Sequence, residues 1–408
     1  MSANSLSNIM PKILARALIS LRTRCIMPRL VNSDYGAEAS KKGSTIDVPV
    51  PVAVGTSPVS PSNVFVDKTG LTPAYVQITM DQWRQNSPIG LTDKDLCEIE
   101  ANEVFLPMQL GEAIKALASD VNQEIIDNYR NANRGVYGVA GTLSDGFGQT
   151  PFDGTHQGVS GATLARKILN QQLCPKTDRR GVVDFAAEAN MLDLSQFSDA
   201  EKIMSAVVRM EGEIGRKYGI DWVADDDVPT HTPGTLEDAG TCVANGTAGN
   251  AYVDLVLTSG SGETVLIGDI LTIAGDSQTY VVIGRSASAE YSDGVYTFAG
   301  TPDTVVVGIA PALKTSPSNA AVTPYAEHVV NMAFHRDAFA FATRPLLDVS
   351  RDYSLGSQML TMQDPVTGLV LRLEVSRQHK QTVWEFDILW GSELIRPELA
   401  TRIVGKGS

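Results

Sequence analysis

The chain has 408 residues, of which 43% are hydrophobic and 20% charged, a composition that excludes a disordered chain and fits two or three folded domains. Its 33 basic and 47 acidic side chains give a formal net charge of −14, which excludes a protein whose whole surface grips a nucleic-acid backbone. The four cysteines form no CxxC pair, so the sequence predicts neither a disulfide framework nor a zinc site and favours a reducing compartment. No apolar run approaches the roughly 18 residues of a membrane-spanning helix, so we expect a soluble chain without a signal peptide.

The first 33 residues form a basic, amphipathic arm without any acidic residue, which leaves a net charge of −19 for the other 375 residues. Its basic residues are Lys12, Arg16, Arg22, Arg24 and Arg29. Its apolar stripe at helical spacing consists of Ile9, Ile13, Ala17 and Leu21. Three interpretations are open: a transit peptide, a helix docked on a neighbouring molecule, or a basic tail that faces a polyanion. Docking is favoured because Pro11 and Pro28 delimit a short helix.

Residues 45 to 90 predict an extended β loop that projects from the body. Apolar residues alternate with polar residues or proline from Ile46 to Val54, which is the period of a half-buried ribbon. Prolines at 49, 51, 58, 61 and 73 remove backbone donors, so these strands belong at an edge or in a protruding hairpin.

The next segment, from Leu106 to Asn131, has apolar residues in helical register and predicts one helix about 37 Å long. Helical and extended signals then alternate up to residue 230. The pattern predicts a helix over 162–173, a strand over 181–187 and a helix over 199–208 that starts at Ser198.

Residues 234 to 322 differ in composition from the rest, with 12 of the 35 glycines, nine acidic residues and only two basic ones. Five or six short β-rich runs separated by Gly, Ser or Asp turns predict a small antiparallel barrel or sandwich. Because mixed α and β signals flank it on both sides, we interpret it as a domain inserted into a loop of its host.

The C-terminal part predicts a return to sheet. Residues 326–343 should begin extended and end as a short helix, and strands should follow over 353–364, 370–378 and 383–390. In the last strand Trp384, Phe386, Ile388 and Trp390 share one face, with Glu385 and Asp387 on the other.

The sequence holds no phosphate-binding loop, nucleophile elbow, HExxH helix or calcium loop, which favours a protein without catalysis and without a cofactor or metal. Asp225, Asp226 and Asp227 raise a metal hypothesis, but successive side chains of an extended segment point to opposite faces. A solvated run or an inter-subunit salt bridge is the preferred interpretation. The five dispersed histidines are interpreted as structural.

Four stretches of sequence stand out around the Gly-rich region: GIDWVADDDVP over 219–229 before it, GDILTIAG over 268–275 within it, NMAFHRDAF over 331–339 after it, and Trp390-Gly391 with Arg396-Pro397-Glu398 near the C-terminus. Together they resemble the major capsid protein of tailed bacteriophages, the HK97-type fold, and within it the podovirus coat protein branch with an inserted β domain. The first stretch resembles the strand that enters that domain, and the second is similar to a strand of such insertions. The third resembles the return into the capsid body, and the last resembles the closing strand.

The resemblance implies an α+β fold with an N-terminal arm, extended β loop, long spine helix, peripheral and axial domains, and a small inserted antiparallel β barrel. The implied domains are an arm over 1–35, an extended β loop over 36–92, a spine-helix region over 93–135, a capsid body over 136–228 and 323–408, and an inserted β domain over 229–322. Candidate contacts between subunits are Val48, Val50, Val52, Val64, Val66 and Lys68, and the arm's basic residues are candidates for the shell interior. Some family members crosslink a lysine of this loop to an asparagine of a neighbour. Lys68 has no matching helper by motif, so we expect non-covalent assembly.

The implied function is self-assembly into pentamers and hexamers that close an icosahedral shell around double-stranded DNA. The implied partners are other copies, a scaffolding protein, a portal protein, a decoration protein where one is present, and weakly the DNA at the inner surface, with no membrane. The protein would be assembled in the host cytoplasm and reside in the virion. One alternative is an encapsulin-like cellular compartment shell, and the other is a glycan- or metal-binding protein that uses the acidic β domain.

Overall fold

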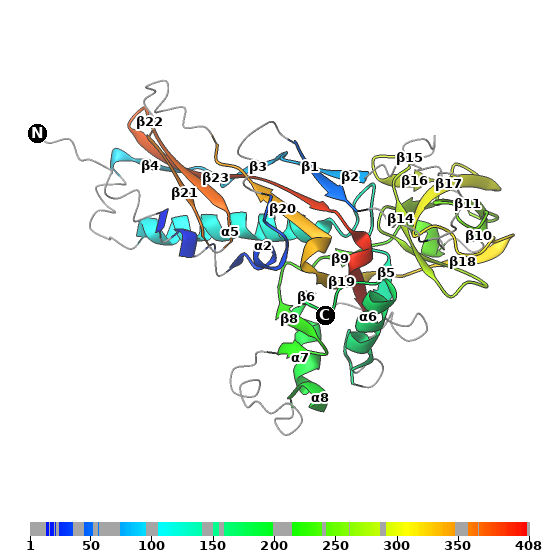
Figure 1. The fold of residues 1–408 in the computed structure, drawn as a ribbon. Helices are drawn as coiled ribbons and strands as arrows, with labels where there is room; N and C mark the ends of the chain where they lie inside the picture. The colour runs from blue at the N-terminus through cyan, green and yellow to red at the C-terminus, as the bar shows by residue number, and fades with distance from the viewer. Residues whose placement is uncertain are drawn as a thin grey trace, which may run out of the picture.

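The computed structural model describes the chain except for residues 1–13, 16, 20, 22–23, 36–44, 52–55, 57–73, 95–104, 141–149, 155–158, 199–213, 239–241, 261, 286–290, 347–357, 366 and 406–408. The protein is α+β with strands in the majority, and the predicted antiparallel barrel is confirmed. Figure 1 shows one long helix, α5, running along a large sheet, with the barrel at one end of the molecule and helices α6, α7 and α8 on the side away from that sheet.

Helix α5 (Phe105–Asp127) is the predicted long helix. Its buried side chains recur at helical spacing and include Ile114, Val121 and Ile125, which pack into the main core. The helix ends four residues before the predicted stop at Asn131. The Asn128 side chain donates to the Glu124 carbonyl at 3.1 Å, and such local side-chain bonds compete with a further helical turn.

The large sheet contains β20 (Phe339–Thr343), β23 (Gln381–Leu394), β22 (Val370–Gln378) and β21 (Gln358–Gln363) in that order, and β3 (Gln82–Gln85) and β4 (Ile89–Thr92) both pair with β23. Trp384, Phe386, Ile388 and Trp390 are all buried, as the predicted shared face requires. The opposite face is not simply solvated, because Asp387 is buried there in an ion pair with Arg372.

The second sheet contains β5 (Gly138–Ala140), β24 (Ala400–Gly405), β19 (His328–His335), β6 (Arg179–Val183), β8 (Ile220–Ala224) and β7 (Gly215–Lys217), and β9 (Thr230–His231) pairs with β19. Helix α6 (Ser160–Gln171) matches the predicted helix and packs on β5 and β24. Helices α7 (Phe185–Asp193) and α8 (Ser195–Ser198) follow β6. The predicted helix over 199–208 lies outside the described residues.

Two sequence predictions in this region were wrong in part. Residues 326–343 end in strand β20, after a single short turn over Arg336–Ala338, and not in a helix. All residues of β19 and β20 are buried, so neither strand shows the polar alternation that marks a half-exposed strand. The predicted strand over 181–187 ends at Val183, and Phe185 to Ala187 begin α7 with Asp184 at the N-cap position.

The barrel closes in the order β10 (Cys242–Asn245), β11 (Tyr252–Leu257), β17 (Asp303–Ala310), β14 (Thr279–Ile283), β13 (Ile270–Ile273) and β18 (Ala320–Pro324). A small sheet of β12 (Thr264–Leu266), β16 (Val295–Thr297) and β15 (Tyr291–Ser292) accompanies it. The barrel has its own core, with Leu255, Tyr280 and Val307 fully buried. Outside it β9 and β19 pair antiparallel, with His231 opposite His328, so the chain leaves the body and returns to it at adjacent positions.

Strand β23 crosses the two-stranded sheet of β1 (Thr45–Val50) and β2 (Ala74–Thr79) at Gly391, where a side chain has no room. A Cβ at this position would collide with the carbonyl oxygen of Thr79, which is backbone and not a movable side chain. We expect Gly391→Ala to lower the free energy of unfolding by about 1–3 kcal/mol, measured by urea titration. Gly111→Ala is the control because a Cβ on that glycine of α5 meets nothing within 4 Å, and it should be neutral or stabilising. Equal effects of the two substitutions would contradict the packing argument.

Candidate assembly surfaces

The hairpin of β1 and β2 is one described part of the predicted extended loop; the other, β3 and β4, pairs with β23 of the large sheet, so those residues do not project from the body as predicted. The strands of the hairpin pair antiparallel, with Ile46 opposite Ile78 and Val48 opposite Val76. These four side chains are buried against Ala340, Ala342 and Ile395 of the same molecule. The alternation predicted the ribbon correctly, but its apolar face lies on the chain's own body.

The six predicted contact residues therefore fall into separate groups. Val48 is 3% exposed and packs within its own molecule, and its assignment as a contact between subunits stays a prediction. Val50 is half-buried and packs against the same cluster. Val52, Val64, Val66 and Lys68 lie outside the described residues, and their assignment stays a prediction.

Aromatic side chains that face solvent mark the surface near the hairpin. Tyr75 on β2 is 63% exposed and Trp83 on β3 is 61% exposed. The indole nitrogen of Trp83 donates to Asp387 at 3.0 Å, which holds the ring in place while it stays open to solvent. Exposed Tyr and Trp are the residue types most enriched where proteins bind one another, because they bury a large area at little entropic cost. The sequence pattern had not singled out either residue.

The N-terminal arm packs on the chain's own long helix. Leu14, Ala17, Leu18 and Leu21 are buried in the main core, and the Cys25 thiol donates to the Ala118 carbonyl at 3.6 Å. The interpretation as a helix docked on a neighbouring molecule was wrong for the described residues, because the surface that receives them belongs to the same chain. These four apolar side chains are therefore already shielded from solvent by their own chain.

The basic residues of the arm are only partly described. Arg24 forms an ion pair with Asp226 at 2.6 Å, so this predicted interior cation is engaged within its own chain. Arg29 is exposed, and its carbonyl accepts from the Arg180 guanidinium at 2.6 Å. Lys12, Arg16 and Arg22 lie outside the described residues.

The three aspartates after β8 converge, which the sequence argument did not expect. Oxygen atoms of Asp225, Asp226 and Asp227 lie within 4.8 Å of one another. The turn that brings them together is fixed by the Asp227 backbone N–H, which donates to Asp225 Oδ1 at 3.1 Å. Their partners are Arg24, Ser119 and Asn122 of the same chain, so the interpretation as an inter-subunit salt bridge was wrong within the described residues.

Asn122 of α5 is fully buried and joins the arm to this acidic turn. Its Oδ1 accepts from the backbone N–H groups of Ile26 (3.1 Å) and Met27 (3.2 Å) at the start of α2 (Met27–Leu30). Its Nδ2 donates to the Arg24 carbonyl at 2.8 Å and to Asp227 Oδ2 at 3.1 Å. One carboxamide thus satisfies groups of the arm and of the segment after β8.

The acidic turn predicts a pH dependence of stability. Burial, together with the charges of Asp227 and Asp226, raises the pKa of Asp225 to about 6 from an ordinary 3.8. The folded protein therefore binds this proton more tightly than the unfolded chain. The resulting stabilisation is fully present below pH 3.8 and is lost as the pH rises through about 6.

Asp225→Asn keeps the Oδ1 acceptor and removes the titration. The variant should gain stability relative to the wild type across this pH interval, with a constant difference above it, as measured by urea unfolding at a series of pH values. Asp193→Asn is the matched control because Asp193 is exposed, and it should show no such gain. Parallel pH profiles for wild type and Asp225→Asn would contradict the prediction.

A buried polar network joins the barrel to the body. The Tyr129 hydroxyl donates to His231 Nδ1 at 2.8 Å, and His231 Nε2 donates to Asp269 Oδ1 at 2.8 Å. Because burial lowers the pKa of His231, the imidazole is neutral, and this pair is a hydrogen bond between a neutral ring and a carboxylate. The other oxygen, Asp269 Oδ2, accepts from the backbone N–H of Gly234 (3.1 Å) and of Leu266 (2.8 Å).

Arg402 of β24 lies beneath this network and is 0% exposed. Its Nη1 donates to the Gly268 carbonyl at 2.8 Å, and its guanidinium carbon lies 4.6 Å from the centre of the Tyr129 ring. Burial lowers the pKa of Arg402 to about 10, while Tyr129 and Asp269 act in the opposite direction. Four elements therefore meet here: the end of α5, strand β9, a turn of the barrel and the C-terminal strand.

Three of the described histidines are buried and hydrogen-bonded within the chain, and the fourth, His379, is exposed. His231 has both ring nitrogens bonded, and its ring centre lies 5.2 Å from that of His328. His328 Nδ1 bonds the Ala326 carbonyl at 2.8 Å, and His335 Nδ1 accepts from the Asp337 N–H at 3.2 Å. His156 lies outside the described residues. Among the helices that the structure describes, none is both long and apolar enough to cross a membrane.

No family model and no curated protein matches the chain. Solved structures similar to it include a chain of Mycobacterium phage Che8, at 14% identity and a TM-score of 0.49, covering 93% of this chain and 91% of that chain. A capsid chain of cyanophage P-SCSP1u has 14% identity and a TM-score of 0.49, covering 94% of this chain and 89% of that chain. The capsid of an empty GTA particle has 9% identity and a TM-score of 0.45, covering 94% and 90%. The likeness to phage capsid chains that the sequence led us to expect is thus found over most of the chain.

Proposed function

We propose that this protein is the major subunit of an icosahedral shell around packaged double-stranded DNA, with copies that assemble into pentamers and hexamers. The role is structural and involves no catalysis. A scaffolding protein, a portal protein and, where present, a decoration protein complete the proposed assembly, with weak contact to DNA at the inner surface. Assembly takes place in the host cytoplasm and the product is the virion.

The observation that carries the proposal is the packing of a single helix along an elongated sheet. Helix α5, with 23 residues, is about 35 Å long, and strand β23, with 14 residues, is about 46 Å long. The two pack together, and the sheet extends beyond the helix (Figure 1). This part of the molecule is a plate built of the sheet, α5 and the arm that packs on α5. A closed shell needs subunits that are thin and broad, because they meet at their edges and enclose a volume with little material.

The surface near the hairpin supports association of such plates. Tyr75 and Trp83 expose large aromatic rings beside it. Tyr75 belongs to β2, whose apolar side is already packed on the body, and Trp83 belongs to β3, which pairs with β23. Burying them against another copy would gain roughly 25 cal/mol per Å² of apolar surface. The same proposal includes the domain boundaries predicted from the sequence. It also includes a position facing the shell interior for Lys12, Arg16 and Arg22.

Electron microscopy and analytical ultracentrifugation of the purified full chain test the proposal. Closed particles with five-fold and six-fold clusters are the expected result. A monomer at every concentration and salt tested would overturn it. If particles form and their contents after purification from the natural source are a cargo enzyme and not DNA, the alternative of a cellular compartment shell replaces the virion.

A further inference from the structure

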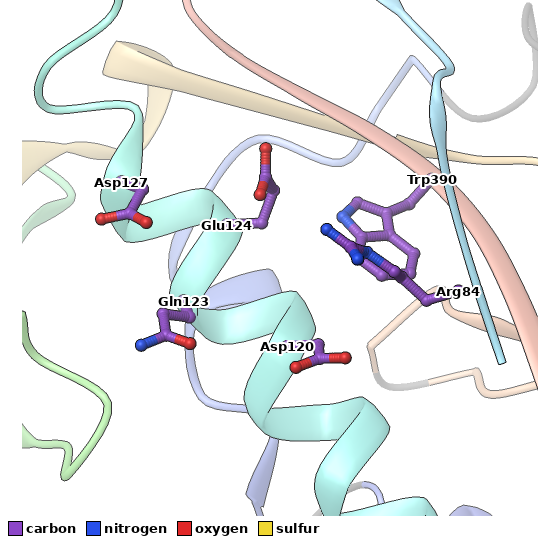
Figure 2. A pocket seen from close by; sticks show the side chains of 6 residues that line it. All are labelled: Arg84, Asp120, Gln123, Glu124, Asp127 and Trp390. Atoms are coloured by element: carbon purple, nitrogen blue, oxygen red, sulfur yellow. The ribbon is translucent and has the colours of Figure 1, made fainter. Parts of the chain in front are cut away.

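The second half of α5 and strands β3 and β23 form a small groove that no part of the assembly described so far uses. Its volume is about 200 Å³. Figure 2 shows the side chains that line it, with four from the helix on one side and two from the strands on the other. They are Arg84, Asp120, Gln123, Glu124, Asp127 and Trp390. We name this site the acidic groove.

Negative charge in the acidic groove exceeds positive charge. Asp120, Glu124 and Asp127 are spaced four and three residues apart, which places them on one face of α5. Asp127 has a distant partner, Arg130, at 3.6 Å. Among the described residues, no ion pair or hydrogen bond reaches the Glu124 carboxylate, and Arg84 across the groove acts on it through its charge alone.

Neighbouring carboxylates add to this imbalance. Burial and the charge of Asp127 raise the pKa of Glu124, and Asp81 acts in the same direction. Burial likewise raises the pKa of Glu393 to about 7, and Asp81 again contributes. Arg84 and Arg130 oppose the shift at Glu124, and Asn131 and Arg134 oppose it at Glu393, but burial outweighs them and the charged forms stay destabilised. A cation in the groove would relieve this cost.

Trp390 supplies an independent sign of a missing partner. Its side chain is 1% exposed, and its indole Nε1 is a buried donor without an acceptor among the described residues. Figure 2 shows this nitrogen on the edge of the ring that faces the helix and Glu124. A buried donor left without an acceptor costs about 1–3 kcal/mol. An occupant that brings an oxygen to this edge would remove that cost.

The spacing of the carboxylates and the volume of the groove indicate whether a metal ion, a water molecule or a larger cation fits the site. Within the described chain, the only acidic trio with ligand atoms close enough for one metal ion is Asp225 to Asp227, so the groove's carboxylates are too widely spread for that role. A volume of about 200 Å³ also exceeds the ~30 Å³ of a single water molecule. An elongated cation attached to a peptide fits both halves of the site: its positive end meets the carboxylates, and a backbone carbonyl meets the Trp390 N–H.

We propose that the acidic groove receives an arginine or lysine side chain of a second copy of this chain, whose backbone carbonyl accepts from Trp390 Nε1. The inference rests on the proposed self-assembly and names one of its contacts. The chain carries 33 basic residues against its overall negative charge, so a copy has the complementary charge to offer. Asp120 and Gln123 are exposed at the rim of the groove, on the side from which a neighbour would approach.

The test uses the full chain with the double substitution Glu124→Gln and Asp127→Asn, which keeps side-chain shape and removes two charges. The concentration at which half the protein is assembled, measured by ultracentrifugation, should rise about fivefold or more, and its dependence on NaCl concentration should weaken. Asp120→Asn, at an exposed position that folding does not require, should shift both quantities in the same direction by less. Glu112→Gln is the control, because Glu112 is an exposed carboxylate of the same helix outside the groove, and it should match the wild type.

Each result has a defined meaning. Thermal unfolding of the dissociated chains identifies a variant that has lost its fold, and Asp120→Asn then carries the test alone. If wild type and Glu112→Gln assemble and the groove variants assemble equally well at every salt concentration, the groove inference is overturned while the proposed function stands. If the wild type itself never associates, both fail.

Discussion

Replacing Asp269 with alanine is expected to lower the free energy of unfolding by about 3–5 kcal/mol. The buried carboxylate accepts from His231 Nε2 and from two backbone N–H groups, and its charge stabilises the buried Arg402 guanidinium. The alanine variant leaves these three donors without their acceptor and the guanidinium without compensation. Because all four tryptophans lie outside the barrel strands, urea titration followed by tryptophan fluorescence reports on the body, and hydrogen exchange of the barrel amides reports on the other side of the joint.

Asp254→Ala is the matched control for this prediction. Asp254 is a half-buried carboxylate on barrel strand β11, and no hydrogen bond reaches its side chain among the described residues. Its removal should change stability by about 0.5 kcal/mol or less. A loss of similar size in both variants would mean that the network at the joint contributes nothing beyond an ordinary acidic side chain.

Replacing Asn122 with alanine is expected to lower the free energy of unfolding by about 3 kcal/mol. The variant leaves the N–H groups at the start of α2 without an acceptor, and the carbonyl of Arg24 loses its donor. The Met27 N–H is buried, so water does not easily replace the lost carboxamide. The arm should then separate from α5 more readily, which faster hydrogen exchange of residues 24 to 31 would detect.

Gln123→Ala provides the comparison at the next position of the same helix. Gln123 is exposed, so its replacement tests the effect of alanine on α5 without removing a buried hydrogen bond. We expect a change within about 0.5 kcal/mol. If Asn122→Ala proves equally mild, and the exchange of the arm is unchanged, the arm is held by its apolar residues alone.

Local periodicity predicted the elements of this protein well. The i, i+3, i+4 pattern located α5 and α6, and alternation located β1, β22 and the buried face of β23, because both signals depend on neighbours within one element. The Gly-rich, acidic composition likewise indicated the barrel. Residues 326–343 were misjudged at their end because β20 is buried on both faces, and such a strand lacks the alternation on which the prediction relied.

Contacts between distant segments could not be predicted in the same way. The convergence of Asp225 to Asp227 depends on a turn and on Arg24, which is 202 residues away in the chain. His231 and His328 meet only because β9 pairs with β19 on either side of the barrel. The acidic groove combines a helix, strand β3 and a tryptophan from the C-terminal part. The spacing on α5 was visible in the sequence, but nothing local indicated that Trp390 would lie opposite.

The pairing of β9 with β19 also determines how the barrel could be exchanged. Opposed residues on adjacent antiparallel strands have Cα atoms about 5 Å apart, so the two points of attachment, at His231 and His328, are almost in contact. Another folded unit with closely spaced termini, or a tight two-residue turn, could be spliced in without stretching the host. Replacing the barrel in this way has one chemical requirement. Arg402 takes its carbonyl acceptor from Gly268 inside the removed segment, so a shortened chain needs an apolar residue of similar volume, such as methionine, in place of the arginine.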